Sequence, residues 1–288
     1  MRSLKSLILV ALVALMPAAG VRAQVTEGDL FGGEVMRPAP TGRTLRYGEA
    51  KEETIRVYRG RGSGSAPVTL LFDASDTSSR HRNYVTEELI RALTDRGIAV
   101  VSIKGDSKTL GGEMDSVRRS LQFVVANAAK ERLDLSRIAL TGYSFGVHLA
   151  GLLATDPTYL RSAGLDFEAL RAAMFLDGGL MSAAELATER AKAPSGSYWS
   201  GDAAVVAALV PEVHLASPNV PRVFFANFKD SKSRTASADT FADQLKAAGV
   251  DVKVHTMMPG DGAASGEPDR RSFRLIREFI EAALKPPR

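Results

Sequence analysis

The sequence contains no cysteine. This absence excludes disulfide bonds, thiolate metal sites and a cysteine nucleophile together. It also suits an oxidising compartment, where a free thiol would be chemically at risk. Nucleotide-binding motifs are lacking, because no G-x-G-x-x-G opens a first helix and no P-loop lysine motif occurs. Metal-ligand spacing is lacking as well, since Asp73-Ala74-Ser75-Asp76 offers too few ligands for an EF-hand-type site. The sequence therefore predicts neither a cofactor nor a metal.

The chain also has little net charge once its N-terminal segment is set aside. Arg2, Lys5 and Arg22 have no acidic counterpart within residues 1–23, so removing this segment lowers the net charge from +4 to +1. A nucleic-acid-binding surface needs clustered lysine and arginine to displace counterions. Nucleic acid is therefore not an expected partner.

Long apolar runs are limited to Leu7 to Met16, which follows the positive residues near the N-terminus. Pro17 to Gly20 would break a helix, and Val21-Arg22-Ala23 has small residues where a signal peptidase requires them. Spanning a bilayer takes about 20 apolar residues, so this run is too short. We expect a signal peptide at 1–23 and export to the periplasm or the exterior, with no membrane attachment after cleavage; an uncleaved anchor is the alternative.

Beyond the signal peptide, residues 24–50 lack periodicity and are expected to form an extended lead-in. In residues 51–288, apolar runs alternate with segments of helical spacing. The expected strands are Thr54 to Tyr58, Val68 to Phe72, Ile98 to Ile103, Ile138 to Thr141, Ala173 to Leu176, Val223 to Ala226 and Val252 to Met257. The expected helices are Tyr84 to Thr94, Met114 to Ala129, Ser144 to Leu153, Phe241 to Ala248 and Ser272 to Leu284. This alternation predicts an α/β domain of three layers, with a mostly parallel sheet covered by helices on both faces.

The motif Gly142-Tyr143-Ser144-Phe145-Gly146 lies between an expected strand and an expected helix. In that context the serine occupies a strained turn that presents its hydroxyl above the sheet edge. Glycines lie two residues on either side because a Cβ there would collide with the neighbouring helix and strand. The Phe145 N–H at the helix start would stabilise an oxyanion. The alternative is an ordinary glycine-containing turn with an incidental serine.

Here the sequence resembles the α/β-hydrolase superfamily, and most closely its carboxylesterase-like branch of secreted esterases and lipases. Besides the motif, the resemblance rests on Asp134 to Leu140, His148-Leu149-Ala150, Val210 to His214, Leu245 to Val250 and Pro259-Gly260. It implies an α/β-hydrolase fold with a small cap insert at about 177–220, containing Tyr198-Trp199. It also implies Ser144 as the nucleophile, Asp230 as the acid and a small-molecule ester as the substrate.

Two parts of the family's machinery are not matched. Where the family has P-G-x-x-H, this chain has Ala263 in place of the histidine, and no histidine follows His255. The family's H-G-G oxyanion loop is replaced by Asp73-Ala74-Ser75, so Ala74 and Ser75 would provide the second part of the oxyanion hole. Removing a triad member typically lowers the rate by several orders of magnitude.

Four histidines are available as substitute bases. His81, which follows the oxyanion loop, is the best candidate, provided that it lies within about 3 Å of the serine hydroxyl, as a base must. We expect His148 to be a buried structural residue, His214 to match a family position that is not the base, and His255 to lie within the last strand.

Three hypotheses follow from the sequence. The chain is a serine hydrolase of small carboxylic esters with an unusual base, an inactive hydrolase-fold protein that binds a ligand or partner, or a structural protein that keeps the motif as a relic. Fold ancestry alone does not decide among them.

Overall fold

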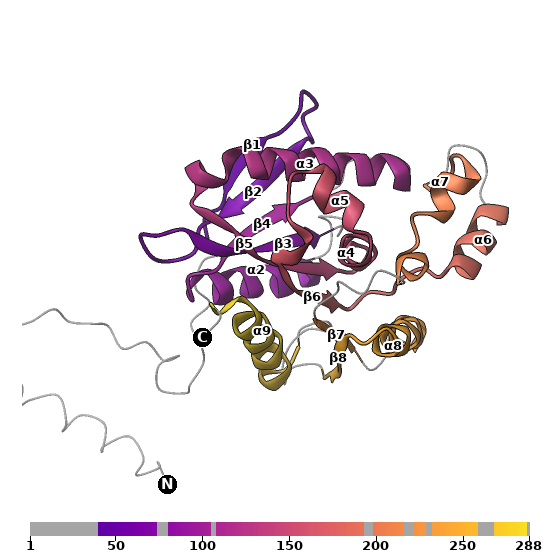
Figure 1. Cartoon of the computed structure of the whole chain (residues 1–288). Helices are drawn as coiled ribbons and strands as arrows, with labels where there is room; N and C mark the ends of the chain where they lie inside the picture. The colour runs from indigo at the N-terminus through magenta and orange to yellow at the C-terminus, as the bar shows by residue number, and fades with distance from the viewer. Residues whose placement is uncertain are drawn as a thin grey trace, which may run out of the picture. The chain divides into compact units, whose positions relative to one another are not determined.

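The computed structural model describes residues 40–73, 80–104, 108–192, 198–215, 222–228, 232–258 and 268–286. Its framework is an eight-stranded sheet with the order β1-β2-β4-β3-β5-β6-β7-β8 (Figure 1). The strands are β1 (Arg43–Arg46), β2 (Thr54–Tyr58), β3 (Ala66–Asp73), β4 (Ala99–Ile103), β5 (Leu133–Tyr143), β6 (Leu170–Leu176), β7 (Arg222–Phe228) and β8 (Asp251–Met257). Strand β2 runs antiparallel to β1 and β4, and all other neighbours are parallel.

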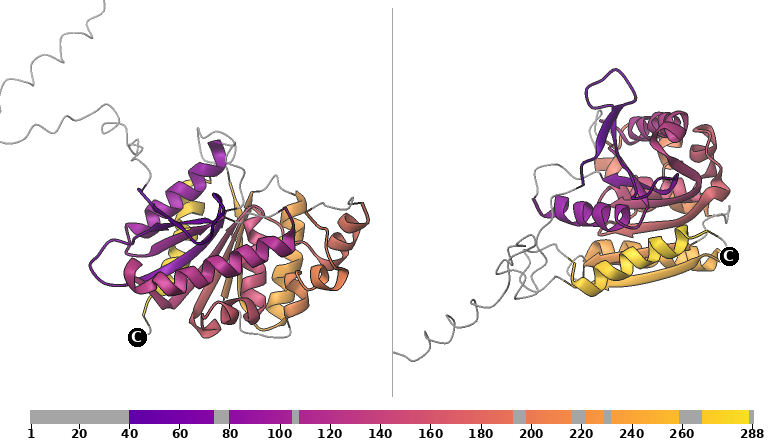
Figure 2. Two further views of the ribbon diagram at one scale, coloured as in Figure 1. Left: turned by 90° about the horizontal axis from the view of Figure 1, so that it is seen from above. Right: turned by 90° about the vertical axis from the view of Figure 1, so that its left-hand side faces the viewer.

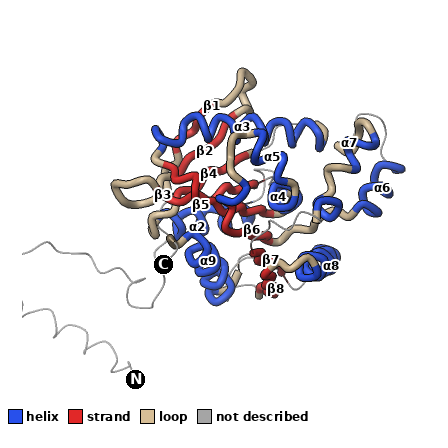
Figure 3. The backbone as a smooth tube through the Cα atoms, in the orientation of Figure 1, coloured by secondary structure: helices blue, strands red, loops and turns tan. Residues whose placement is uncertain are grey.

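Helices cover both faces of this sheet (Figure 2). One face packs against α2 and α9, and the other packs against α3, α4, α5 and α8. The helices are α2 (Arg80–Thr94), α3 (Leu110–Glu131), α4 (Gly146–Thr155), α5 (Pro157–Ser162), α6 (Ala183–Lys192), α7 (Ala203–Ala207), α8 (Lys232–Ala247) and α9 (Arg270–Leu284), with the short 3₁₀ helices η1 (Phe167–Ala169) and η2 (Pro211–His214). Figure 3 shows the alternation of strands and helices that the sequence predicts. The α/β architecture with three layers is thus present.

The central strands are buried on both faces, as their apolar composition predicts. Leu70, Leu140 and Phe225 are completely or almost completely covered and belong to the core under α3, α4 and α8. Their neighbours Leu71, Ala139 and Phe224 point to the other face, against α2 and α9. Because successive side chains alternate between faces, a strand buried on both sides reads as a continuous apolar run.

The expected lead-in at 24–50 contains one strand, β1, in the part that the structure describes. Strand β1 is short and exposed, and two ion clusters fasten the β1–β2 hairpin to α3. The Glu131 carboxylate is buried and lies 3.1 Å from Arg43 Nη2 and 3.2 Å from Arg59 Nη2. Glu53 pairs with Arg119, and the Ala50 N–H and this arginine together lower the pKa of Glu53.

The residues expected to form the cap carry α6, α7 and η2, and Figure 1 shows α6 and α7 beside the sheet. Leu186, Val206 and Val210 form a small apolar cluster there, and Trp199 packs against it. This insert therefore has a core of its own. The Leu110 N–H donates to Tyr198 O at 2.8 Å, which ties the insert to the first turn of α3.

Candidate functional site

Ser144 occupies the turn between β5 and α4 with a φ of 55°. A positive φ is costly for a residue with a side chain, and the surrounding contacts hold it. The Ser144 N–H donates to Leu176 O on β6 at 3.0 Å, and the Val147 N–H donates to Ser144 O at 3.1 Å. The serine side chain is half-buried. The local strand–turn–helix geometry is therefore the one that the sequence motif predicts.

Three glycines allow this turn because no side chain fits where they lie. A Cβ on Gly146 would lie 1.9 Å from Phe72 O on β3, and a Cβ on Gly142 would lie 2.5 Å from Val147 Cα. A Cβ on Gly178 would lie 2.2 Å from Ser144 O. Real Cβ atoms essentially never approach other atoms within 3.0 Å. The two motif glycines are thus required by close backbone packing, and Gly178 is a third that sequence reasoning did not find.

Phe145 has helical backbone angles at the start of α4. Within the described part of the chain, its N–H makes no backbone hydrogen bond. A free N–H at a helix N-terminus can stabilise negative charge. The other predicted oxyanion residues, Ala74 and Ser75, lie outside the described residues. The strand before them ends beside the motif, because Asp73 of β3 is the register partner of Tyr143.

An aromatic cluster from the insert covers the beginning of α4. The Phe145 ring lies edge-on to Tyr198 at 5.2 Å and to Trp199 at 6.2 Å between centroids. Burial raises the pKa of the Tyr198 phenol far above its usual value, and the nearby Glu113 carboxylate raises it further. The insert therefore contacts the residue that directly follows the serine, and Tyr198 stays protonated.

His148, one turn further along α4, has both ring nitrogens occupied. Nε2 lies 2.8 Å from Leu209 O and donates to it, while Nδ1 accepts from the Met181 N–H at 3.4 Å. Burial lowers the pKa of His148 to about 4, and the bond to Leu209 opposes this only in part. The ring is 2% exposed, so it is a neutral structural histidine, as expected from the sequence.

The remaining histidines differ in their surroundings. His255 Nε2 lies 2.8 Å from Ser272 Oγ. Because the Ser272 hydroxyl donates its hydrogen bond to Asp269 Oδ2, its oxygen accepts a hydrogen bond from His255. Neighbouring strands lie about 4.8 Å apart, so β8, which carries His255, lies about 14 Å from β5, which leads into Ser144. His214 Nε2 lies 2.7 Å from Ala208 O. His81 belongs to the first turn of α2.

The predicted acid Asp230 and the alanine at the expected histidine position, Ala263, lie outside the described residues. At the ends of β6 and β7 the structure shows two polar residues that sequence reasoning missed, Asp177 and Asn227. The Asp177 N–H donates to Ala226 O at 2.8 Å, and Asn227 Oδ1 accepts from the Gly178 N–H at 3.2 Å. The sequence signal for Asp177 is a polar residue followed by two glycines directly after the apolar run of β6.

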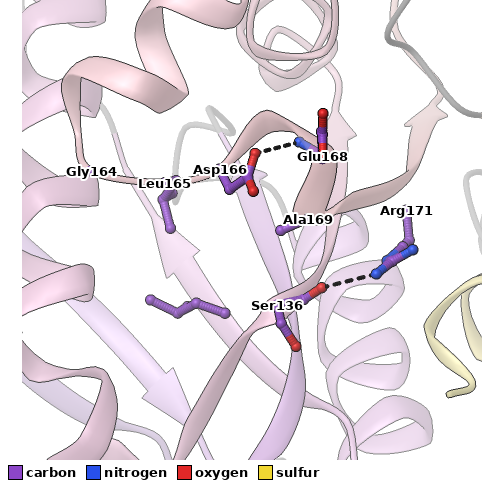
Figure 4. A pocket seen from close by; sticks show the side chains of 8 residues that line it. Ser136, Gly164, Leu165, Asp166, Glu168, Ala169 and Arg171 are labelled. Carbon is purple, nitrogen blue, oxygen red and sulfur yellow. Dashed lines mark hydrogen bonds between the residues drawn. The ribbon is translucent and has the colours of Figure 1, made fainter.

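Other features of the described residues lie away from Ser144. A pocket of about 540 Å³ is lined by Ser136, Asp166, Glu168 and Arg171 at the amino ends of β5 and β6, opposite to the edge with the serine (Figure 4). No group of three or more potential metal ligands occurs in the ranges that the structure describes. None of the described helices is long and apolar enough to cross a membrane.

Comparisons with known proteins agree with this geometry. Residues 74–169 match the model of the BD-FAE family, an esterase family of the α/β-hydrolase type. No curated protein matches the sequence.

Solved structures share the fold at low sequence identity. A bifunctional GH43-CE protein from Bacteroides eggerthii is 20% identical, with a TM-score of 0.65 over 86% of this chain and 39% of its own length. Esterase B from Lactobacillus rhamnosis is 16% identical, with a TM-score of 0.63 over 85% of this chain and 86% of its own. An acetyl ester-xyloside bifunctional hydrolase from Caldicellulosiruptor lactoaceticus is 18% identical, with a TM-score of 0.62 over 86% and 98%. The predicted α/β-hydrolase fold is confirmed, and so is the resemblance to esterases of this superfamily.

Proposed function

We propose that this chain, which has the α/β-hydrolase fold, is a carboxylic ester hydrolase with Ser144 as its nucleophile. The observation that carries the proposal is the positive φ of Ser144 on a strand–turn–helix whose glycines admit no side chain. A protein retains such strain where the conformation is used. The esterase family match and the esterase titles of the similar structures support the same reaction class.

In this reaction Ser144 Oγ forms a bond to the acyl carbon of the ester while its proton passes to a base. The carbonyl oxygen becomes an oxyanion near the Phe145 N–H. The intermediate then expels the alcohol, which takes the proton from the base, and leaves an acyl-enzyme on the serine. Water attacks this acyl group, gives its proton to the base, and the carboxylic acid leaves as Ser144 Oγ is reprotonated.

We further propose that the base is not the histidine of the family's usual position, which Ala263 occupies. His148 is neutral with both nitrogens bonded, and His255 donates to Ser272. His214 lies at the far end of α4, with Nε2 2.7 Å from Ala208 O and Nδ1 3.8 Å from Asp156 Oδ2. His81 is therefore the histidine to test as the base, with Asp230 as the acid that the resemblance implies.

The test is hydrolysis of p-nitrophenyl acetate and butyrate by the purified protein, with Ser144→Ala, His81→Gln and Asp230→Asn beside it. Ser162→Ala, which alters an exposed serine at the end of α5, serves as the matched control. We expect turnover above buffer that Ser144→Ala abolishes and Ser162→Ala leaves unchanged. A fluorophosphonate that labels Ser144, located by mass spectrometry, gives an independent readout. Equal rates for the wild type and Ser144→Ala would reject the esterase.

The second candidate is an inactive hydrolase-fold protein that binds a small ligand or a partner. It is favoured by the double departure in sequence, Ala263 for histidine and Asp73-Ala74-Ser75 for the glycine-rich loop. Saturable binding of an ester or its acid, with no turnover and no labelling of Ser144, would support this candidate over the enzyme.

We also propose that the protein is exported and cleaved after Ala23, on the sequence pattern at residues 1–23. The intact mass of protein recovered from the periplasm or the medium tests this. The expected N-terminal residue is Gln24, whereas a chain that retains Met1 and sediments with membranes would contradict the proposal.

A further inference from the structure

The side chain of His148 lies where two segments of the insert meet. The first segment leads from β6 to α6, and the second follows α7. In the first, the Met181 N–H donates to His148 Nδ1 at 3.4 Å, and in the second, Leu209 O accepts from His148 Nε2 at 2.8 Å. Because His148 belongs to α4, one ring joins both segments to the helix that begins directly after the Ser144 turn.

The helix α4 does not itself require a histidine at this position. Its ten residues are all buried, and His148 is the only one among them that can ionise. A buried polar side chain costs free energy unless its donor and its acceptor are both bonded. A neutral imidazole offers one donor and one acceptor on a rigid ring, which match the Leu209 carbonyl and the Met181 N–H. The hydrogen bonds of His148 therefore hold the insert rather than α4.

The same ring packs against Phe145, one turn earlier on α4. The two ring centroids lie 6.0 Å apart, with an angle of 26° between the ring planes. The Phe145 ring also lies edge-on to Tyr198 and Trp199, which both belong to the insert. Phe145 is thus enclosed by His148 on one side and by two rings of the insert on the other.

Another hydrogen bond fastens the insert at a distance from Phe145. The Ser237 hydroxyl of α8 donates to Leu180 O, in the segment between β6 and α6. This bond holds one segment of the insert and does not involve α4. Among the described residues, His148 is the one side chain that bonds both segments and also contacts Phe145.

We propose that His148 is a positioning residue, which holds the insert so that Tyr198 and Trp199 pack on Phe145 and form the apolar surface against which the ester binds. The kinetic part of this inference rests on the proposed hydrolase function. His148 takes no proton from Ser144 and touches no substrate, because its own donor and acceptor are bonded to the insert. The insert has an apolar core of its own, so loss of these bonds is expected to displace it as a unit.

Three substitutions separate the hydrogen bonds of His148 from general stability. His148→Leu and His148→Phe both remove the two bonds, with different side-chain volumes, so that either one suffices if the other does not fold. His148→Gln keeps an amide donor and acceptor. Ser237→Ala removes the separate bond to Leu180 O. Leu93→Ala is the stability control, because it leaves a cavity on the opposite face of the sheet, under α2.

The first readout requires no catalysis. Trp199 is the only tryptophan in the chain, so tryptophan fluorescence reports on the aromatic cluster alone. We expect His148→Leu and His148→Phe to shift the emission to longer wavelength and to raise the acrylamide quenching constant, because Trp199 becomes more exposed to water. His148→Gln should shift it less. Ser237→Ala and Leu93→Ala, measured well below their Tm, should match the wild type.

The second readout is the division of the effect between KM and kcat. On p-nitrophenyl butyrate, the two apolar His148 variants should raise KM about 10-fold, a typical value for lost apolar contacts of a substrate. The value of kcat should change only a few-fold, because binding is lost equally from the ground state and the transition state. On p-nitrophenyl acetate the rise in KM should be smaller, since the shorter acyl chain has less apolar surface to bury.

Wild-type emission and quenching in His148→Leu or His148→Phe would overturn the inference. An equal shift in His148→Gln would overturn the role of the hydrogen bonds, and an equal shift in Leu93→Ala would reduce the effect to general destabilisation. A lack of Ser144-dependent turnover in the wild type would reject the hydrolase function instead. The two failures are distinguishable, because the fluorescence of Trp199 is measured without a substrate.

Discussion

Gly146→Ala tests the packing on which the Ser144 turn depends. The new Cβ would lie 1.9 Å from Phe72 O, 2.6 Å from Phe72 C and 3.2 Å from Phe72 Cβ. Since an ordinary contact is about 3.4 Å or more, α4 must move away from β3 by about 1.5 Å. Overpacking of this kind costs about 1–3 kcal/mol, and the helix-forming preference of alanine returns at most about 1 kcal/mol. We therefore expect a net loss of about 2 kcal/mol in the free energy of unfolding.

For a domain of this size, such a loss lowers Tm by about 4–8 °C. The displacement also shifts Phe145 and Ser144, and a misplacement of about 1 Å is expected to lower kcat about 100-fold. Gly111→Ala is the matched control, because it lies in the first turn of α3 with no atom within 4 Å of the added Cβ. It should raise Tm by about 1–2 °C. Differential scanning calorimetry measures both, and a Gly146→Ala protein that melts with the wild type would refute the packing argument.

Three further predictions concern stability. Glu131→Gln should lower the free energy of unfolding by about 2 kcal/mol in urea titrations, because Arg43 and Arg59 lose their buried anionic partner while both arginines keep access to water. An unchanged urea midpoint would show that other contacts hold the β1–β2 hairpin. The pKa of His148 is lowered from 6.5 to about 4, so the unfolded chain binds the proton first. The contribution of neutral His148 to the free energy of unfolding is complete above pH 6.5 and falls by about 3 kcal/mol as the pH drops to 4. His148→Gln should flatten this pH dependence in urea titrations carried out at each pH. Asp269→Ala removes the N-cap of α9, where Oδ1 accepts from two backbone N–H groups. It should lower the free energy of unfolding by about 1 kcal/mol in the same assay. Asp243→Ala, on the exposed surface of α8, is the control and should leave the free energy of unfolding unchanged.

The sequence predicted the elements whose residue pattern, either alternating or continuously apolar, stays the same along their length. The five residues of β2 alternate regularly and were delimited correctly, and the central strands were recognised by their apolar runs. Prediction of the boundaries failed where composition changes inside an element. Helix α3 begins with Leu110-Gly111-Gly112, and β5 contains the polar positions Asp134 and Ser136 near its start, so both were predicted too short. Strand β1 was not predicted because its four residues are largely polar and exposed.

The Ser144 turn was predicted because its sequence signature is local, although distant segments hold it in place. A strand, a serine between two glycines and a helix follow one another within a short stretch of chain. Asp177 could not be found this way, since its positive φ and its hydrogen bond to Ala226 O on β7 depend on segments that are distant in sequence. For the same reason the packing of Tyr198 and Trp199 on Phe145 was foreseen only as an unspecified cap.

The bracing of Ser144 by β6 also determines when the turn can form as the chain emerges. Leu176 accepts the hydrogen bond from the Ser144 N–H and Gly178 packs against its carbonyl, yet both come more than thirty positions later. A nascent chain that has reached only residue 169, where the family match ends, already contains the motif but not the strand that fixes it. The serine would then rest in a relaxed backbone and acquire its strained conformation only once β6 has joined the sheet. The Ser144 turn is thus expected to form late in folding, after β6 has joined the sheet.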